Sequence, residues 1–223
     1  MITTNNLQII KEMIAVQHPI LREINSQYAF LSSMIERFPQ LMKEWITTQE
    51  HEVEQLARQE ADGDFEVYSS IYASEISRTE SCYYEEFLFN QAMLIMVYSY
   101  YESFLCRLAK ECNAKDYWPS VIAKTFGVTL EEDLLKISSF LRETILPLRN
   151  QLCHNNNGTL FSRKSEGKDA IDHLIQRKCI SLDDGRICVL DRNLIQETLD
   201  DEYKILLKLA DICGYKTTMI GQK

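Results

Sequence analysis

The sequence predicts an all-α fold, a helical bundle with a long N-terminal helix and a small C-terminal β-hairpin. Three observations support this fold class. Only seven Gly and four Pro occur in 223 residues, which favours helices over many-stranded architectures. Apolar residues recur at helical spacing through most of the chain. Strand-like alternation is confined to residues 179–189, where Asp184-Gly185 is typical of a hairpin turn.

The composition is that of an ordinary soluble globular protein, with 45% hydrophobic and 26% charged residues. The length suits one well-packed domain or two small ones, and we assign residues 1–223 to a single domain. We find no basic start followed by a long apolar run, so we expect neither a signal peptide nor a membrane span. The seven cysteines form neither a repeated C-x-x-C nor a zinc-spaced cluster. We therefore expect reduced thiols, no metal, no cofactor and a cytoplasmic location.

The net charge of −9 argues against a surface made wholly for nucleic acid. The charge is uneven, because residues 136–192 hold ten Lys or Arg against seven Asp or Glu, whereas the rest of the chain carries −12. A near-neutral to basic segment inside an acidic chain permits local phosphate binding, although ordinary variation along a surface explains it equally well. We expect neither DNA nor a membrane as a partner.

The first helical segment can begin at Pro19 itself, and its helical pattern extends from Ile20 as far as a break at residues 61–64, Ala-Asp-Gly-Asp. Pro39 should kink this helix or split it into two. The far end of the helix is mostly polar and charged, so residues 1–62 are expected to form an N-terminal helical arm that projects or covers a partner. A short helix or ordered loop should follow at residues 65–81.

The helix predicted over residues 83–112 is apolar on two sides. One stripe consists of Phe87, Leu94, Tyr98, Tyr101, Leu105, Leu108 and Cys112, and the other of Phe89, Met93, Met96, Tyr100 and Phe104. Such a helix is either central in its own bundle or shared with a second chain. Residues 113–126 are interpreted as a loop with a short helical turn.

The next helix, expected from about residue 130 to residue 155, carries a single apolar stripe that should face the core. The stripe consists of Leu134, Ile137, Leu141, Ile145, Leu148 and Leu152. Pro147 lies inside the helix and should bend it. Residues 155–158, Asn-Asn-Asn-Gly, are a strong helix stop because Asn and Gly tolerate left-handed geometry.

Arg149, Asn150 and His154 lie away from this stripe, in the order R-N-x-x-x-H. At 100° per residue, Asn150 and His154 fall roughly 170–210° from the centre of the stripe, and Arg149 roughly 70°. The helix thus presents an imidazole, an amide and a guanidinium opposite its leucines. The alternative interpretation is an ordinary capped and solvated helix end.

Residues 166–213 should contain a helix, the β-hairpin and a C-terminal helix. In the hairpin, Leu182 is expected to face Ile187 and Ile180 to face Val189. The residues Asp-Arg-Asn that follow can cap the last helix, which should end near residue 214, a glycine.

The R-N-x-x-x-H spacing resembles the R-x4-6-H signature of the HEPN family (higher eukaryotes and prokaryotes nucleotide-binding), in the form written for its ribonuclease members. Residues 96–105, Met-Val-Tyr-Ser-Tyr-Tyr-Glu-Ser-Phe-Leu, resemble the aromatic-and-Glu helix of that family. The resemblance covers residues 83–157, the expected core helices. It implies a HEPN-like bundle and a homodimer with paired motifs at its interface.

For the motif residues, the resemblance implies metal-independent cleavage of RNA by its own 2′-hydroxyl, leaving a 2′,3′-cyclic phosphate. His154 would act as general acid or base, because imidazole titrates near neutral pH. Arg149 would hold the phosphate, and Asn150 would orient either group. Glu102 is a candidate supporting acid, with an exposed helix glutamate as the alternative. Cys153 is interpreted as packing, because adjacent helix residues point roughly 100° apart.

We therefore expect an endoribonuclease, a hydrolase acting as a toxin or an anti-phage defence effector. Its partners would be RNA, a second copy of the chain, and an antitoxin or defence protein. Asn156 stands where some toxins of the family carry a tyrosine that the antitoxin modifies, which puts that form of control in doubt. Two alternatives remain open. One is a non-catalytic HEPN-like module that binds RNA or protein, and the other is an acidic helical adaptor that acts through its N-terminal arm.

Overall fold

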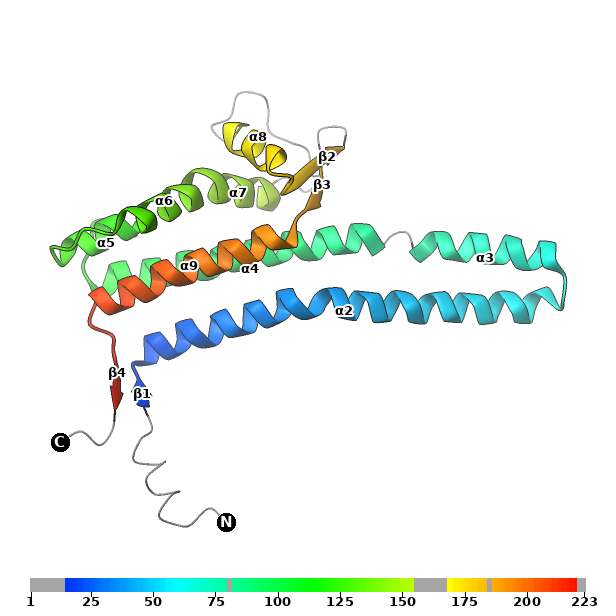
Figure 1. Ribbon diagram of the computed structural model, residues 1–223, viewed down its shortest axis with the longest axis horizontal. Coiled ribbons are helices and arrows are strands. Elements are labelled where there is room, and N and C mark those ends of the chain that lie inside the picture. The colour runs from blue at the N-terminus through cyan, green and yellow to red at the C-terminus, as the bar shows by residue number, and fades with distance from the viewer. Residues whose placement is uncertain (1–14, 80–81, 155–167, 184–185, 220–223) are drawn as a thin grey trace, which may run out of the picture. The chain divides into compact units, whose positions relative to one another are not determined.

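The computed structural model describes residues 15–79, 82–154, 168–183 and 186–219, which are mainly helical (Figure 1). The fold class is all-α, with two small two-stranded antiparallel sheets in the described part. The elements are, in order, β1 (Ala15–Gln17), α2 (Pro19–Ala61), α3 (Phe65–Thr79), α4 (Cys82–Glu111), α5 (Pro119–Thr125), α6 (Glu132–Phe140), the π-helical turn η1 (Leu141–Ile145), α7 (Leu146–His154), α8 (Lys168–Gln176), β2 (Ile180–Asp183), β3 (Arg186–Leu190), α9 (Arg192–Ile212) and β4 (Thr217–Met219). Within these residues, no helix combines the length and the apolarity needed to cross a membrane.

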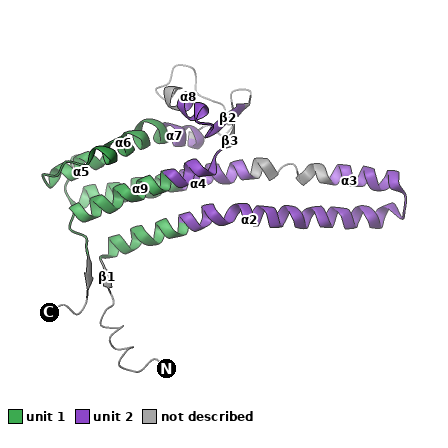
Figure 2. Ribbon diagram, viewed as in Figure 1, with its two compact units in different colours: residues 1–30, 97–146, 198–223 green, residues 31–96, 147–197 purple. Residues whose placement is uncertain are grey.

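The chain forms two compact units, each assembled from separate stretches of sequence (Figure 2). Unit 1 consists of residues 1–30, 97–146 and 198–223, and unit 2 consists of residues 31–96 and 147–197. A unit boundary therefore falls inside α2, inside α4, inside α9 and after the first residue of α7. Neither unit corresponds to a contiguous stretch of chain.

Unit 1 has an apolar core that is tied together by tyrosine hydroxyls. The Tyr100 hydroxyl of α4 donates to the Ile24 carbonyl of α2 at 3.0 Å. The Tyr203 hydroxyl of α9 donates to Asn25 Oδ1 at 2.7 Å. These bonds satisfy groups that would be costly to leave unpaired away from water. Large, fully buried side chains of this unit are Ile24, Tyr101, Leu105, Leu108, Ile122, Leu141 and Ile145.

Unit 2 holds α2 and α4 together by an aromatic stack. The rings of Phe38 and Phe89 lie parallel with centroids 3.5 Å apart. Asn90, only 4% exposed, donates from its side-chain nitrogen to the Leu190 carbonyl at 2.9 Å and so fixes the end of β3. Large, fully buried side chains of this unit are Met93, Leu94, Leu148, Leu174 and Ile180.

α2 begins at Pro19, as predicted, and it continues through Pro39 without interruption to Ala61. The alternative of two separate helices is therefore wrong. A proline inside a helix removes one backbone hydrogen bond. Close to Pro39, Ile35 is buried and Phe38 stacks on an α4 ring, and these contacts offset that loss. The break predicted after α2 is confirmed, since Gly63 has a left-handed φ of 86°.

β2 and β3 pair in antiparallel orientation, and their register differs from the predicted one at one end. Leu182 lies opposite Ile187. Ile180, however, lies opposite Leu190 and not opposite Val189 as the sequence predicts. The reason is a bulge just before Leu182, which adds one residue to the second strand and shifts the pairing.

The sequence predicts neither the sheet of β1 and β4 nor the full length of α5. β1 pairs with β4 in antiparallel orientation, with Ala15 opposite Met219 and Gln17 opposite Thr217. The strands have three residues each, too few for alternation to stand out. α5 occupies part of the predicted loop and has Pro119 in its first turn, where a missing N–H costs nothing.

Candidate functional site

The motif lies at the end of a helical run over residues 132–154. In the middle of that run, Leu141–Ile145 form a π-helical turn, closed by a bond from the Leu146 N–H to the Leu141 carbonyl. Pro147 follows directly, and its ring has no N–H and crowds the preceding turn of an α-helix. A wider turn just before the proline relieves this crowding. The sequence does not predict this π turn, and the bend that it predicts at Pro147 stays a prediction.

α7 separates buried leucines from half-buried polar residues. Leu148 and Leu152 are 0% and 7% exposed, as the apolar stripe predicts. Arg149 and Asn150 are half-buried. Arg149 Nη1 donates to Asn150 Oδ1 at 2.9 Å, so the amide oxygen holds the guanidinium in one orientation. The structure thus brings two of the predicted site residues together.

His154 is the last residue of α7, at the helix end where the dipole favours a positive charge. The side chain of His154 lies outside the described residues. The same is true of Asn156, of the predicted helix stop at residues 155–158 and of the predicted turn at residues 184–185. Cys153, interpreted as packing, is half-buried.

The last turn of α7 is fixed from α4, within unit 2. Gln91 Nε2 donates to the Leu152 carbonyl at 3.0 Å. That carbonyl belongs to the last turn of the helix, where backbone oxygens have no intrahelical partner. Gln91 therefore acts as a side-chain cap on the end that carries the motif. Sequence reasoning missed this role, although an amide pair, Asn90 and Gln91, between the apolar stretches 87–89 and 92–97 is a usable signal.

Glu102 belongs to the part of α4 in unit 1 and is half-buried. Its charge acts on two neighbours there. Burial raises the pKa of the Tyr117 hydroxyl, and the negative charge of Glu102 raises it further. Burial and then the charge of Glu102 raise the pKa of the Cys106 thiol in the same way. Its assignment as a supporting acid for the motif rests on the family resemblance and stays a prediction.

The part of the chain that the structure describes contains no group of three or more His, Cys, Asp or Glu side chains that could hold a metal ion. No family model, no curated protein and no solved structure matches this chain. The resemblance to the HEPN family is therefore carried by the motif and by residues 96–105 of α4.

Proposed function

We propose that the protein is a metal-independent endoribonuclease whose active site is built from Arg149, Asn150 and His154. The observation that carries the proposal is the placement of the R-N-x-x-x-H motif on the final turns of α7. Its guanidinium is already held by the Asn150 amide at 2.9 Å, and Gln91 caps the helix end. A helix end fixed in this way supports a preorganised polar site, which is what phosphate chemistry needs.

In the proposed reaction, the ribose 2′-hydroxyl attacks the adjacent phosphorus, and the bond to the 5′-oxygen breaks. His154 takes the proton from the 2′-hydroxyl or gives one to the leaving oxygen. Arg149 stabilises the negative charge that grows on the phosphorane oxygens. Because Asn150 Oδ1 already accepts from Arg149, its role is to orient the guanidinium. One motif supplies one His, so a homodimer with paired motifs completes the acid and base.

The test is cleavage of a mixed RNA substrate by the purified full chain in the presence of EDTA. We expect wild-type protein to leave a 2′,3′-cyclic phosphate and a 5′-hydroxyl. His154→Ala and Arg149→Ala should each lower the rate by at least about 100-fold. Cys153→Ala is the matched control, since it changes the residue next to His154 and should leave the rate unaltered. If the protein is a toxin, expression should arrest growth with the same residue dependence.

Several outcomes would count against the ribonuclease. Cleavage that needs an added divalent metal contradicts the mechanism, and full activity in His154→Ala contradicts the assignment. RNA binding without cleavage, unaffected by His154→Ala, instead supports the non-catalytic HEPN-like module. If the active site needs two chains, the cleavage rate per chain should fall when the protein is diluted below the dissociation constant of the dimer. A rate per chain that does not change on dilution would indicate a monomeric site.

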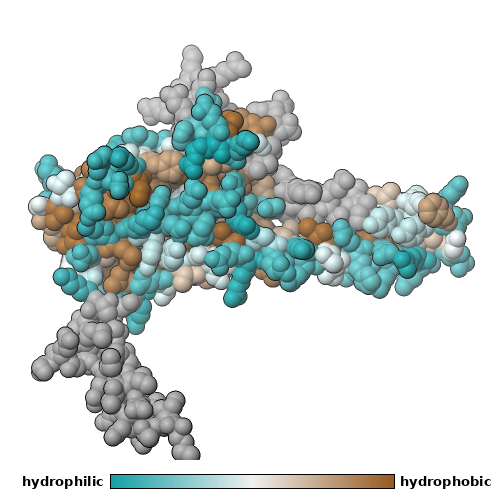
Figure 3. All heavy atoms as spheres, in the orientation of Figure 1, coloured by the Kyte–Doolittle hydropathy of each residue, from teal (hydrophilic) through white to brown (hydrophobic). Residues whose placement is uncertain are grey.

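A second candidate, the acidic helical adaptor, is favoured by exposed apolar side chains on α2 and α3. Leu41 is 58% exposed, Trp45 42% and Phe65 78%. Figure 3 shows brown patches that interrupt the hydrophilic surface along these helices. Several exposed apolar side chains on one surface often indicate a partner-binding site. Trp45→Ser should then abolish partner capture while Thr48→Ala, on the same helix, leaves it intact.

A further inference from the structure

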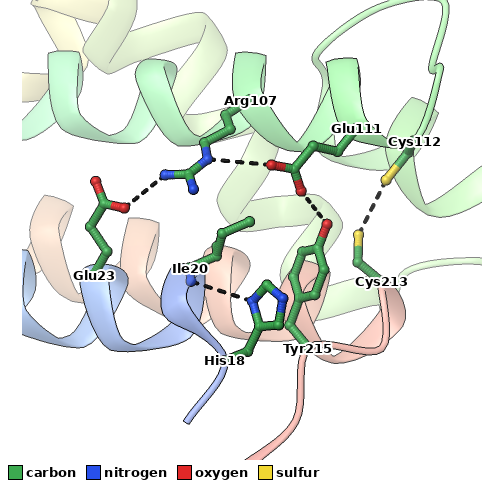
Figure 4. Close-up of polar contacts among 8 residues, drawn as sticks. All are labelled: His18, Ile20, Glu23, Arg107, Glu111, Cys112, Cys213 and Tyr215. Atoms are coloured by element: carbon green, nitrogen blue, oxygen red, sulfur yellow. Dashed lines mark hydrogen bonds and ion pairs between the residues drawn. The ribbon is translucent and has the colours of Figure 1, made fainter.

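Two cysteines far apart in sequence meet in unit 1. Cys112 directly follows α4, and Cys213 directly follows α9 (Figure 4). Their sulfur atoms are 3.4 Å apart, although 101 positions separate the two residues in the chain. Both are half-buried thiols in the reduced state. The separation is close to van der Waals contact, so a bond needs only a small approach of the two side chains.

The backbones that carry these cysteines end in matching turns. Asn113 and Gly214, the next residues, have left-handed φ values of 54° and 79°. In each turn the following N–H, of Ala114 or Tyr215, donates at 2.9 Å to the carbonyl five residues earlier. This is the pattern of a Schellman motif, which fixes the end of a helix. Each cysteine is therefore held at a defined point by its own helix cap.

A second contact joins the same two segments beside the sulfur pair. The Tyr215 hydroxyl donates to the Glu111 carboxylate, and the ring of Tyr215 stacks on His18 with centroids 4.2 Å apart. Glu111 also accepts from Arg107 Nε at 3.4 Å, and Arg107 Nη1 bonds Glu23 at 2.7 Å. Figure 4 shows these side chains together with the two sulfurs. The neighbouring bonds keep the thiols facing each other before any oxidation.

We propose that Cys112 and Cys213 are a redox site in which the two thiols form a reversible intramolecular disulfide. The oxidant is a small-molecule disulfide such as oxidised glutathione. The Cys112 thiolate attacks one sulfur of the oxidant, a mixed disulfide forms, and one glutathione thiolate leaves. The Cys213 thiolate then attacks the Cys112 sulfur and releases the second glutathione. Two protein thiols become one disulfide, and their two protons end on two glutathione molecules. This proposal is independent of the ribonuclease.

Local electrostatics sets the rate of this exchange. Burial, the contact with Cys112 and the charge of Glu111 raise the pKa of Cys213 to about 12. In the reduced pair, Cys213 therefore holds its proton more tightly than a free thiol, and oxidation of the pair accelerates as the pH rises. The disulfide closes a loop over residues 112–213, which includes α7.

The experiment uses the full reduced chain, incubated with oxidised glutathione, alkylated and mapped by mass spectrometry without reduction. We expect one cross-linked peptide that joins Cys112 to Cys213 and lacks two hydrogens. Oxidation should raise the midpoint of thermal unfolding by roughly 5–15 °C. Cys112→Ser and Cys213→Ser should each lose both effects. Cys106→Ser is the matched control, because it removes an exposed thiol of α4 and should behave as wild type.

The proposal is overturned if both cysteines carry separate glutathione adducts, if either bonds a different cysteine, or if the cross-link forms only between chains. Circular dichroism of the reduced variants shows whether each is folded. If one serine variant is unfolded, the other still decides the matter, since either substitution removes the bond. The readout is a covalent mass, so a chain without ribonuclease activity tests the disulfide equally well.

Discussion

Replacing Glu202 with Gln is expected to change how the stability of the protein depends on pH. Glu202 lies on α9 in unit 1 and is 0% exposed. Neither carboxyl oxygen has a hydrogen-bond partner among residues 15–79, 82–154, 168–183 and 186–219. Burial, assisted by the negative charge of Asp201, raises the pKa of Glu202 well above its usual value. The group is thus neutral in the folded protein at pH values where the unfolded chain ionises it.

The magnitude follows from proton linkage. In the unfolded chain, a glutamate has a pKa of about 4.3. Between that value and the raised pKa of the folded state, the folded protein binds one proton more than the unfolded chain. The free energy of unfolding therefore falls by about 1.4 kcal/mol for each pH unit in this interval. The contribution of Glu202 is fully present below the unfolded pKa and is lost as the pH rises through the folded pKa.

The assay is chemical denaturation of wild type and Glu202→Gln at several values from about pH 4 to about pH 8. Gln does not titrate, so the stability of the variant relative to wild type should grow with pH. Its buried amide adds a constant cost of about 1–3 kcal/mol, which leaves the slope unaffected. Asp211→Asn is the control, because Asp211 is an exposed carboxylate on the same helix. Parallel curves for wild type and Glu202→Gln would refute the neutral buried carboxyl group.

Three further predictions test individual hydrogen bonds. Gln91→Ala should lower the free energy of unfolding by about 1 kcal/mol and speed amide exchange at the end of α7, because the Leu152 carbonyl loses its donor. Unchanged exchange there would contradict the capping role. Asp191→Ala should lower the free energy of unfolding by about 1 kcal/mol, because the Asp191 carboxylate caps α9 by accepting from the Asn193 N–H at 3.0 Å. Asp191→Asn keeps an acceptor and should cost little. Equal losses of stability in the two variants would exclude the cap. Tyr28→Phe should lower the free energy of unfolding by about 1 kcal/mol, because it removes the 2.8 Å hydrogen bond from the Tyr28 hydroxyl to Asp200. Purely additive losses of stability in a double-mutant cycle with Asp200→Ala would argue against that bond.

Helices and their ends could be predicted because the signals for them are local. The predicted helix over residues 83–112 matches α4 (Cys82–Glu111) to within one residue at each end. The final helix starts after Asp191, whose side chain bonds the Asn193 N–H, and stops before Gly214, which has a left-handed φ. Periodicity, caps and glycines act within a few residues, so the sequence displays them directly.

Contacts between distant segments could not be predicted in this way. The Gln91 bond to the Leu152 carbonyl joins residues 61 positions apart, and the pairing of β1 with β4 joins the two ends of the described chain. Glu202 is a different case, because a signal exists. It lies at helical spacing between Leu199 and Leu206, both fully buried, so it occupies an apolar stripe. Its acidic neighbours make the same stretch resemble a solvated face.

Because each unit is built from separate segments of the chain, truncations and point substitutions differ in how clearly their effects can be interpreted. Removing residues 1–62 to test the helical arm would also remove Ile24 and Asn25, which accept the hydroxyls of Tyr100 and Tyr203 in unit 1. A loss of activity after that truncation would follow from damage to unit 1 as readily as from loss of the arm. Point substitutions such as Trp45→Ser and His154→Ala leave those bonds in place. A phenotype that appears in one and not in the other therefore assigns the function to α2 or to the end of α7.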